Sequence, residues 1–345
     1  MTWRQPLWYV AEMEERPVLV APDSFKGTFR ASQVAGAIGR GLERAGLMPP
    51  DLCPVADGGE GTLDALVPQL GGEVIAAPAH DPLGRELTGC FALVEDGDSA
   101  IVETATASGL SLVAEAERDA WAASTYGTGE LIAAAAQAGV QVIVVAVGGS
   151  ATTDGGAGAL DAIEEAGGLR GARLVVLCDV RTPFDHAPKV FAPQKGADPA
   201  MVRRLERRLD ELAAGWRRDP RGVPMTGCAG GLSGGLWAVH GAVLEPGAQW
   251  VLDALAFDRR MRAARAVVTG EGRLDEQTLQ GKLVGEIGTR ARQAGVPLHA
   301  IVGTDRLDAF GKRMIDLMRV LEATTLAELE AAGETLGREL AEGRA

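Results

Sequence analysis

The sequence predicts an α/β protein built from two domains. Its 345 residues exceed what one ordinary hydrophobic core accommodates. Short apolar runs are repeatedly followed by a glycine-rich loop and then by apolar residues at helical spacing, which is the rhythm of a parallel sheet with crossover helices. A hairpin pattern interrupts this rhythm in the middle of the chain. The 46 glycines cluster directly after apolar runs, where backbone must turn tightly or approach a ligand.

The first third of the chain contains two predicted strand–loop–helix units. Val18 to Ala21 is a short apolar run that ends at Pro22. Helical spacing follows at Val34, Ile38 and Leu42, with Ser32 as the expected N-cap. A second strand is expected to end at Pro54-Val55-Ala56, and a helix follows with apolar positions at Leu63, Leu66, Val67 and Leu70.

The middle of the chain combines a hairpin with buried parallel strands. Residues 87–94 and 100–104 flank the sequence Glu95-Asp96-Gly97-Asp98, which predicts a β-hairpin with an Asp-Gly turn. Val140 to Val147 is rich in β-branched residues and predicts a strand buried on both faces. Leu174 to Leu177 predicts another. An amphipathic helix is indicated by Met201, Leu205, Leu209 and Leu212.

The last third returns to the parallel rhythm of the first. Strands are expected at Ala266 to Val268 and Leu298 to Val302, and Thr325 with Glu328 forms a capping box that begins a final helix. Because strands near both ends look alike, we expect a discontinuous domain made of residues 17–75 plus 251–345. Residues 76–250 would be an inserted α/β domain with the hairpin, and residues 1–16 an N-terminal extension.

Composition narrows the class of partner. The net charge of −13 argues against nucleic acid, which needs a basic footprint, but allows a small anion bound by a few local cations. The four cysteines are not arranged as a disulfide framework, and the four histidines lack metal-ligand spacing. No apolar run reaches membrane-spanning length. We therefore expect a cytoplasmic protein, monomeric or homodimeric, without membrane partners.

Charged residues gather at the expected carboxyl ends of the strands, where open parallel sheets bind ligands. They are Asp23, Ser24 and Lys26; Asp57 and Glu60; Ser150 and Asp154; Asp179; and Glu271, Arg273 and Asp275. A Mg-nucleotide site needs carboxylates for the metal, glycine N–H groups for phosphate oxygens and a nearby cation. Each loop alone could be a plain turn, Lys26 a solvated lysine and Asp154 a helix N-terminal acid. Their number favours a phosphoryl-transfer site.

Other familiar signatures are absent or weak. Gly281-Lys282 is followed by Leu283, so there is no Walker A motif. Residues 231–235 match a G-x-S-x-G nucleophile elbow around Ser233, but no strand precedes them, and a hydrolase is disfavoured. Residues 203–208 are basic and keep helical spacing, which is typical of a solvated helix face.

Taken together in order, the loops resemble the bacterial type I glycerate kinase family. The matching segments are residues 21–27, 54–62, 81–85, 103–110, 126–132, 148–158, 178–180, 192–196, 269–275 and 281–282. The resemblance implies ATP-dependent phosphorylation of D-glycerate with Mg²⁺, usually to 2-phosphoglycerate. It also implies one Rossmann-like domain (the discontinuous one) and one flavodoxin-like domain, with the active site in the cleft between them.

The resemblance and the loop chemistry together assign hypothetical roles. Mg-ATP would lie against glycine backbone groups, cations would hold the glycerate carboxylate or the moving phosphoryl group, and an aspartate, Asp179 or Asp23, would orient the hydroxyl. The expected catalytic residues are Asp23, Lys26, Asp179, Lys195 and Arg273. The expected nucleotide- and phosphate-binding residues are Ser24, Gly58, Gly59, Gly148, Gly149, Ser150 and Lys282. The expected metal-binding residues are Asp57, Glu60, Asp154, Glu271 and Asp275.

The chain departs from the family pattern at three places. Only Leu169 to Ala172 fill a segment that is usually longer, Thr182-Pro183-Phe184 stands where the family favours Asn-Pro-Leu, and Thr153 precedes Asp154 in place of asparagine. The shortening could trim a surface excursion or reshape the surroundings of Asp179. Two alternatives to a glycerate kinase therefore stay open: a kinase for another small hydroxy acid, and an inactive nucleotide- or metabolite-binding regulator.

Overall fold

The computed structural model describes residues 16–280 and 282–343, and within them the chain divides into two compact units. The first unit comprises residues 16–57 and 251–343, and the second residues 58–250. The first division, between Asp57 and Gly58, lies earlier than the expected boundary near residue 75. The predicted extension, except for Arg16, lies outside the described residues. Among the described residues, no helix is both long and apolar enough to cross a membrane.

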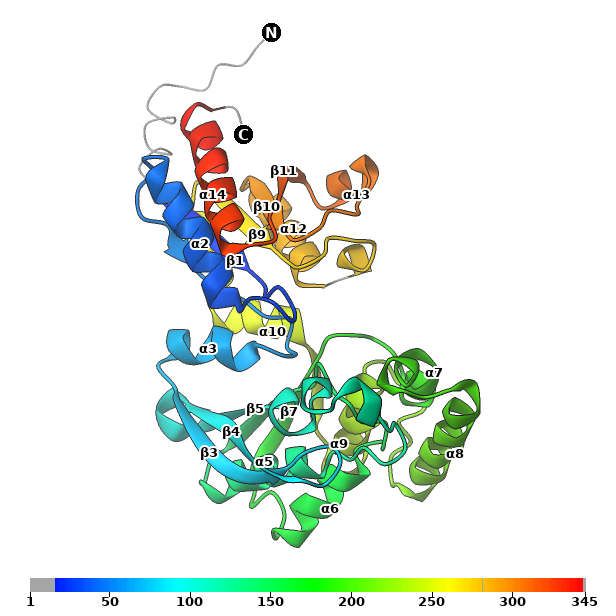
Figure 1. Ribbon diagram of the computed structural model, residues 1–345. Coiled ribbons are helices and arrows are strands. Elements are labelled where there is room, and N and C mark those ends of the chain that lie inside the picture. Colours follow the sequence, from blue (N-terminus) through cyan, green and yellow to red (C-terminus); the bar gives the residue numbers. More distant parts are fainter. Residues whose placement is uncertain (1–15, 281, 344–345) are drawn as a thin grey trace. The chain divides into compact units, whose positions relative to one another are not determined.

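The first unit contains an all-parallel sheet with the strand order β11-β10-β9-β1-β2 (Figure 1). Its strands are β1 (Val18–Pro22), β2 (Asp51–Leu52), β9 (Ala266–Gly270), β10 (Leu298–Val302) and β11 (Leu317–Glu322). Its helices are α2 (Ala31–Arg44), α11 (Phe257–Ala263), α12 (Leu283–Ala294), α13 (Ala309–Met314), α14 (Leu326–Ala341) and the short 3₁₀ turn η7 (Thr278–Gln280). Helix α10 (Gly247–Ala254) spans the second division of the chain.

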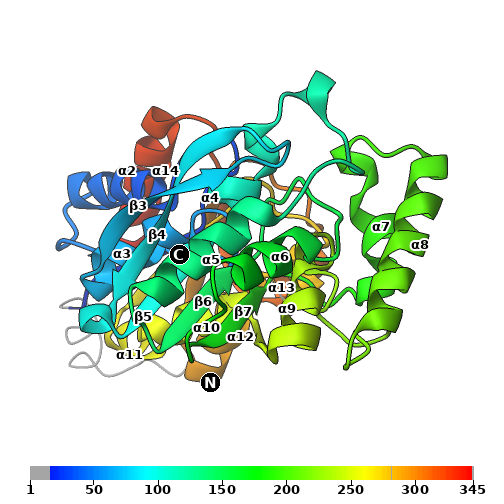
Figure 2. The same cartoon turned by 90° about the horizontal axis from the view of Figure 1, so that it is seen from below.

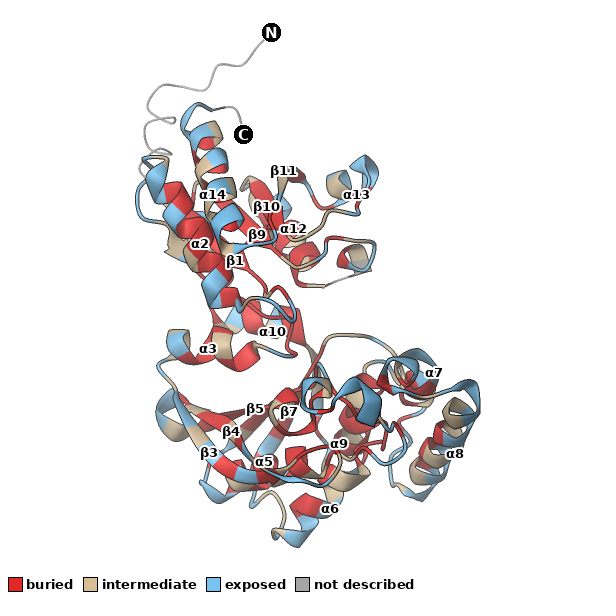
Figure 3. Cartoon of the chain, viewed as in Figure 1, coloured by how far each residue is buried: buried red, intermediate tan, exposed pale blue. Residues whose placement is uncertain are grey.

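The core of the first unit lies between its sheet and the helix pair α2–α14. β1, β9 and β10 are buried along their whole length, as continuous apolar runs require when both faces of a sheet are covered (Figure 3). α2 and α14 lie side by side and cross very closely. A Cβ on Gly41 would lie 2.1 Å from the Glu330 carbonyl oxygen, and one on Gly333 would lie 2.5 Å from that of Ile38. Only glycine permits this helix crossing.

The second unit contains a six-stranded mixed sheet with the order β3-β4-β5-β6-β7-β8. Its strands are β3 (Glu73–His80), β4 (Glu86–Val94), β5 (Ser99–Glu103), β6 (Val142–Ala146), β7 (Arg173–Cys178) and β8 (Val243–Pro246). Its α-helices are α3 (Thr62–Leu70), α4 (Ala105–Ser108), α5 (Tyr126–Gln137), α6 (Ala157–Glu165), α7 (Ala187–Phe191), α8 (Pro199–Gly215) and α9 (Leu232–His240). Its 3₁₀ turns are η1 (Glu95–Gly97), η2 (Leu110–Leu112), η3 (Glu115–Glu117), η4 (Phe184–His186), η5 (Pro193–Lys195) and η6 (Cys228–Gly231).

The predicted hairpin is confirmed at β4 and β5, which pair antiparallel. Asp96 and Gly97 have φ values of 54° and 90°, as a tight Asp-Gly turn requires. From β5 to β8 the pairing is parallel, and β6 is buried between its two neighbours. Figure 2 shows α5 and α6 side by side, and the core of this unit lies where they pack with the sheet. The two-unit α/β class predicted from the sequence is therefore confirmed.

Two local predictions need correction. Helix α2 begins at Ala31, so Ser32 is not its N-cap; instead the Gln33 side chain accepts a hydrogen bond of 3.0 Å from the Arg30 N–H. The strand expected to end at Ala56 is regular only to Leu52. Its backbone nevertheless continues beside β1, because the Val55 N–H donates to the Pro22 carbonyl at 3.0 Å.

Candidate functional site

A polar cavity of about 490 Å³ lies in the first unit, beyond the carboxyl ends of β1, β9 and β10. This is the edge at which open parallel sheets bind ligands. The residues that line it are Asp23, Ser24, Phe25, Lys26, Thr28, Asp57, Glu271, Gly272, Arg273, Asp275, Lys282, Leu283, Gly303, Thr304 and Thr324. Eight residues predicted from the sequence are therefore brought together here. Sequence reasoning missed the hydroxyl groups of Thr28, Thr304 and Thr324.

Asp23 is the most buried carboxylate of this cavity. It follows β1 directly and is only 6% exposed, and its Oδ1 accepts a 2.6 Å hydrogen bond from the Ser24 N–H. Burial, followed by the negative charges of Asp57 and Glu271, raises the pKa of Asp23 to about 8, although Lys26 and the Ser24 N–H oppose this shift. Asp23 is therefore about half-protonated near pH 8, because its burial disfavours the charged form.

Lys26 and Asp57 form an ion pair across the same cavity. The Lys26 Nζ donates to the Asp57 Oδ2 at 3.1 Å, although these residues lie on different loops. The Asp57 side chain is 9% exposed, whereas that of Lys26 is 57% exposed. A half-open ion pair of this kind contributes little to stability. It does keep a positive charge beside the two aspartates and leaves the lysine accessible to a ligand.

The loop after β9 supplies the third carboxylate. Burial raises the pKa of Glu271 to about 7, against the opposing hydrogen bond from Thr278 and the charge of Lys282. The Thr278 hydroxyl donates to the Glu271 Oε1 at 2.7 Å and accepts from the Asp275 N–H at 3.2 Å. Thr278, which the sequence analysis missed, therefore fixes the loop that carries both acids. Its only sequence signal is a threonine three residues after an aspartate at a turn.

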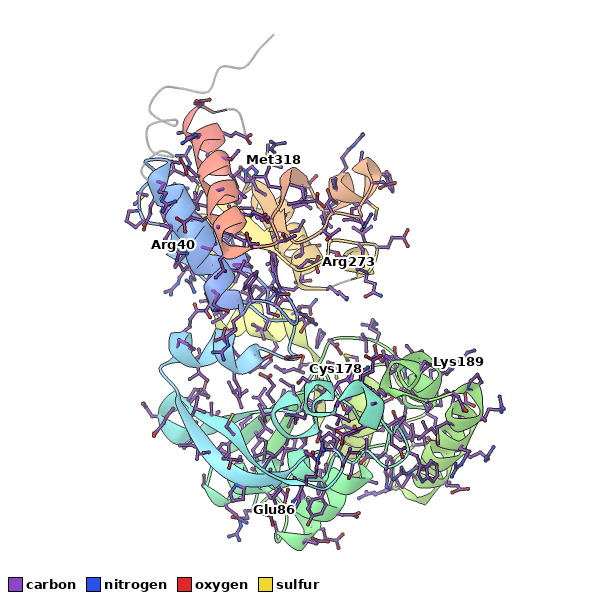
Figure 4. All side chains as sticks on the ribbon, viewed as in Figure 1. Arg40, Glu86, Cys178, Lys189, Arg273 and Met318 are labelled. Carbon is purple, nitrogen blue, oxygen red and sulfur yellow. The ribbon has the colours of Figure 1, made fainter. Side chains whose placement is uncertain are left out.

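Two further cations border this cavity. Arg273 is exposed and has no hydrogen-bond or ion-pair partner among the described residues; Figure 4 labels it on the loop after β9. Lys282 donates from its Nζ to the Gln277 Oε1 at 2.7 Å. With Lys26, they place three cations around three clustered carboxylates and Asp275. Such a mixture of charges can bind an anion and a hard cation side by side.

The acids of the cavity fit a magnesium ion that is bound partly by the protein and partly by the phosphates of a substrate. In the part of the chain that the structure describes, no three histidine, cysteine, aspartate or glutamate side chains form a ready metal cage. Mg²⁺ commonly binds one or two carboxylates together with waters and substrate phosphates. The raised pKa values of Asp23 and Glu271 also reflect unneutralised negative charge, which a bound cation would relieve.

The glycine loops of the second unit pack against one another. A Cβ on Gly148 would lie 2.5 Å from the Gly59 Cα, and one on Gly58 would lie 2.6 Å from the Gly247 Cα. Gly58 also has a φ of 86°. The structure therefore brings the predicted residues Gly58, Gly59, Gly148 and Gly149 into neighbouring loops, with the exposed Glu60 beside Gly149. Their close packing already explains why side chains are excluded, and phosphate binding there stays a prediction.

Glu103 was missed as a site residue, although it controls one of these loops. Its carboxylate is 6% exposed and accepts hydrogen bonds from the Gly61 N–H at 3.0 Å and the Leu63 N–H at 3.1 Å. These are free N–H groups at the beginning of α3, where an anion is favoured. An internal carboxylate therefore occupies that position. The sequence signal was a glutamate at the end of an apolar run, which also suits an ordinary strand end.

Asp154 has a comparable structural role. It is 1% exposed, and its carboxylate accepts from the Thr125 N–H and hydroxyl, both at 2.8 Å, and from the N–H groups of Gly156 and Gly158 at 3.1 and 3.2 Å. Four protein donors leave little room for a metal ion. The structure thus favours the alternative interpretation of Asp154 as a helix N-terminal acid, which joins the beginnings of α5 and α6.

Lys195, Ser150 and Asp179 occupy the loops at the carboxyl edge of this second sheet. Lys195 is 3% exposed, and its Nζ donates to the Thr152 carbonyl. Burial lowers the pKa of Lys195 to about 8, although the negative charges of Asp154 and Asp179 oppose the shift. The Ser150 hydroxyl lies 2.8 Å from that of Thr152. Asp179 is half-buried directly after Cys178, which ends β7 and is labelled in Figure 4.

Two sequence features are resolved by their surroundings. Ser233 is buried in α9, and its hydroxyl donates to the Met225 and Cys228 carbonyls at 2.7 and 3.3 Å, so it is no exposed nucleophile. The shortened segment at residues 169–172 forms a turn before β7, closed by the Ala172 N–H to the Leu169 carbonyl at 2.9 Å. Asp179 lies beyond the other end of that strand. The shortened segment and Asp179 therefore lie at opposite ends of β7.

The sequence profile of one family covers nearly the whole described chain. The profile described as the glycerate kinase family matches residues 18–167 and 164–336. The chain belongs to the glycerate kinase family. This result agrees with the order of the strand-end loops, and family membership supports a kinase with a small-molecule substrate.

Individual relatives support the same assignment. The chain is 38% identical over 329 residues to a glycerate kinase from Halalkalibacterium halodurans. This alignment covers 83% of this chain and 85% of the relative. It is 34% identical over 326 residues to glycerate 2-kinase from Escherichia coli, with coverage of 83% and 85%. A solved structure assigned as glycerate kinase 2 from Salmonella typhimurium LT2 superposes with a TM-score of 0.80 at 32% identity, covering 95% of this chain and 99% of that one.

Proposed function

We propose that this protein transfers the terminal phosphoryl group of ATP to the 2-hydroxyl of D-glycerate, with Mg²⁺, and gives 2-phosphoglycerate and ADP. The observation that carries the proposal is the cavity of the first unit, in which Lys26, Arg273 and Lys282 surround the acids Asp23, Asp57 and Glu271. The E. coli relative named glycerate 2-kinase supports the choice of hydroxyl. The family supports the kinase chemistry.

The carboxylates would hold the metal and accept the proton. Asp57 and Glu271, with Asp275 at the rim, are the candidates for Mg²⁺, which when bound neutralises phosphate charge. Asp23 is the candidate for the residue that orients the glycerate hydroxyl and accepts its proton. Burial, the largest cause, raises the pKa of Asp23 above that of an ordinary aspartate, and this makes its carboxylate a stronger base, as a general base requires.

The cations would hold the two anionic reactants. A loose phosphoryl-transfer transition state is stabilised mainly by positioning and by positive charge near the equatorial oxygens. Arg273, whose guanidinium has no protein partner in the described chain, suits bidentate binding of a phosphate or carboxylate. Lys26 would add a mobile point charge. In the second unit, the residues proposed to contact the reactants remain Asp179, Lys195, Ser150 and the glycine loops at Gly58, Gly59, Gly148 and Gly149.

The proposal extends to the setting of the enzyme. The cysteines at positions 53, 90, 178 and 228 are free thiols, which suits a reducing compartment such as the cytoplasm. ATP and D-glycerate would be its partners, and a monomer or homodimer would suffice for the chemistry.

One experiment tests donor, acceptor and position together. The purified protein is incubated with D-glycerate, ATP and Mg²⁺, the product is identified by phosphorus and carbon NMR, and ADP is quantified by chromatography. We expect phosphorus coupled to carbon 2 and one ADP for each phosphoglycerate. Phosphorus on carbon 3 would refute the position, and no ADP from glycerate but ADP from hydroxypyruvate or tartronate would refute the acceptor. Ser233→Ala is the matched control and should retain full activity.

A further inference from the structure

A cluster of basic and aromatic side chains lies outside the residues used so far. It consists of Trp121, which precedes α5, and Arg204, Arg207 and Arg208 on α8, and we call it the arginine–tryptophan cluster. With Ala122 and Glu211 it lines a cavity of about 440 Å³ on the surface of the second unit. Figure 3 shows exposed residues along α8, and Trp121 is itself 37% exposed. A cavity of this size accommodates a small metabolite.

Two guanidinium groups of the cluster share one indole ring. The guanidinium carbons of Arg204 and Arg208 lie 4.4 and 5.1 Å from the centroid of the Trp121 ring, and Arg208 also donates to the Trp121 carbonyl at 2.9 Å. Arg204 and Arg208 are one helical turn apart, where like charges repel. Packing on the ring fixes both side chains in position. The result is a preorganised pair of positive charges facing a cavity.

The arginines of the cluster take part in no ion pair within the part of the chain that the structure describes. Among the described residues, no carboxylate forms an ion pair with Arg204, Arg207 or Arg208, although the chain has 47 acidic and only 34 basic side chains. By contrast, Arg290 contacts Asp253, Asp258 and Glu286. The Asp119 carboxylate next to Trp121 is engaged by the N–H groups of Trp121 and Ala122. A surface of uncompensated arginines in an acidic protein indicates an external anion.

The cluster is connected to Lys195 by packing. The loop before Trp121 contacts α8 and the segment around Lys195, because Ala120, Ala192 and Leu205 form one small buried core. In addition, Arg118 donates to the Gln194 carbonyl at 3.5 Å, and a Cβ on Gly196 would lie 2.9 Å from the Arg118 carbonyl oxygen. Both neighbours of Lys195 therefore touch the loop that carries Trp121. A ligand that tightens this loop would also restrict Lys195.

We propose that the arginine–tryptophan cluster is a second binding site, for a small anion with at least two negative charges on phosphate groups. Guanidinium forks match phosphate oxygens in pairs, and two fixed arginines favour a diphosphate over a single carboxylate. Glu211, the one acid in the lining, limits affinity and so suits a reversible effector. An effect on turnover through Lys195 rests on the kinase function proposed above, whereas anion binding does not.

Calorimetric titration with inorganic pyrophosphate, without ATP, tests the site directly in the full chain. The wild-type protein should bind saturably, Arg204→Ala/Arg208→Ala should weaken binding by about tenfold or more, and Glu211→Gln should tighten it about threefold, since each change alters one charge next to the anion. Arg203→Ala is the matched control: it lies on the same helix and is exposed, but it does not line the cavity. It should bind like the wild type.

Three results would overturn the proposal. The first is the absence of saturable pyrophosphate binding, and the second is equal binding by the wild type and the double variant. The third is tighter binding of citrate than of pyrophosphate, which would make this a site for carboxylates. Sedimentation velocity adds a fourth: self-association that the double variant abolishes would mean that an acidic surface of a second copy occupies the cluster. Because none of these measurements requires turnover, failure of the proposed kinase reaction would leave the binding result interpretable.

Discussion

Replacement of Lys195 by methionine gives the sharpest test of the electrostatics in the second unit. Methionine preserves most of the apolar stem and removes the charge. In the wild type, burial lowers the pKa of Lys195 from an ordinary 10.5 to about 8. Between these two pH values the unfolded chain therefore binds more protons than the folded chain, and stability contributed by this residue rises with pH. Below pH 8 the folded protein carries a buried ammonium group at a cost.

The size of the effect follows from the two pKa values. A difference of about 2.5 pH units corresponds to roughly 3 kcal/mol of unfolding free energy gained between pH 8 and 10.5. Lys195 is 3% exposed, so solvent screening reduces this little. Asp23 and Glu271 also change charge near neutrality, but they do so in both proteins. The difference between the wild type and Lys195→Met therefore isolates the lysine.

Urea unfolding followed by circular dichroism at pH 7, 8, 9, 10 and 10.5 measures this difference. We expect the unfolding free energy of the wild type to rise relative to Lys195→Met by about 3 kcal/mol from pH 8 towards 10.5. In the same range, any activity that needs the ammonium charge should fall. Lys189→Met, an exposed lysine on α7 that Figure 4 labels, is the control and should follow the wild type. Parallel curves for the wild type and Lys195→Met would refute the argument.

The other predictions also concern single residues, and they are checked by turnover assays and by unfolding measurements. Lys26→Ala should lower kcat by about 100-fold or more, because loss of this cation costs transition-state stabilisation. The Tm should change little, since the Lys26 side chain is 57% exposed. Near-normal turnover of the variant would exclude a role of Lys26 in phosphoryl transfer. Glu103→Gln should cost about 1–3 kcal/mol in urea unfolding, because an amide accepts from only one of the Gly61 and Leu63 N–H groups; an unchanged midpoint would contradict this. The unfolding free energy of the wild type should fall by about 3 kcal/mol between pH 6.5 and pH 4. The reason is that burial lowers the pKa of His299 to about 4, so the unfolded chain is protonated first. His299→Leu should lack that loss, and equal acid sensitivity of the two proteins would count against this prediction.

Local pattern was sufficient for the elements that have a strong local cause. The β-branched run of β6, the Asp-Gly turn between β4 and β5, and the capping box at Thr325, whose hydroxyl accepts from the Glu328 N–H at 3.2 Å, lie where the sequence predicted them. The beginning of α2 was misplaced because its cap is formed by Gln33, a residue that also suits a helix interior.

The sequence by itself determined the α/β class, the strand-end loops and, through their order, a family that the comparisons then confirmed. Only the tertiary structure decided which charges share a site. Asp23, Lys26, Asp57 and Glu271 meet because parallel strands distant in sequence end at one edge of the same sheet. In the sequence, Asp154 and Glu103 resemble the acids of that cavity. In the structure, however, both carboxylates accept hydrogen bonds from backbone N–H groups at the beginnings of helices. The difference is set by which donors surround a carboxylate, and those donors come from residues up to 42 positions away.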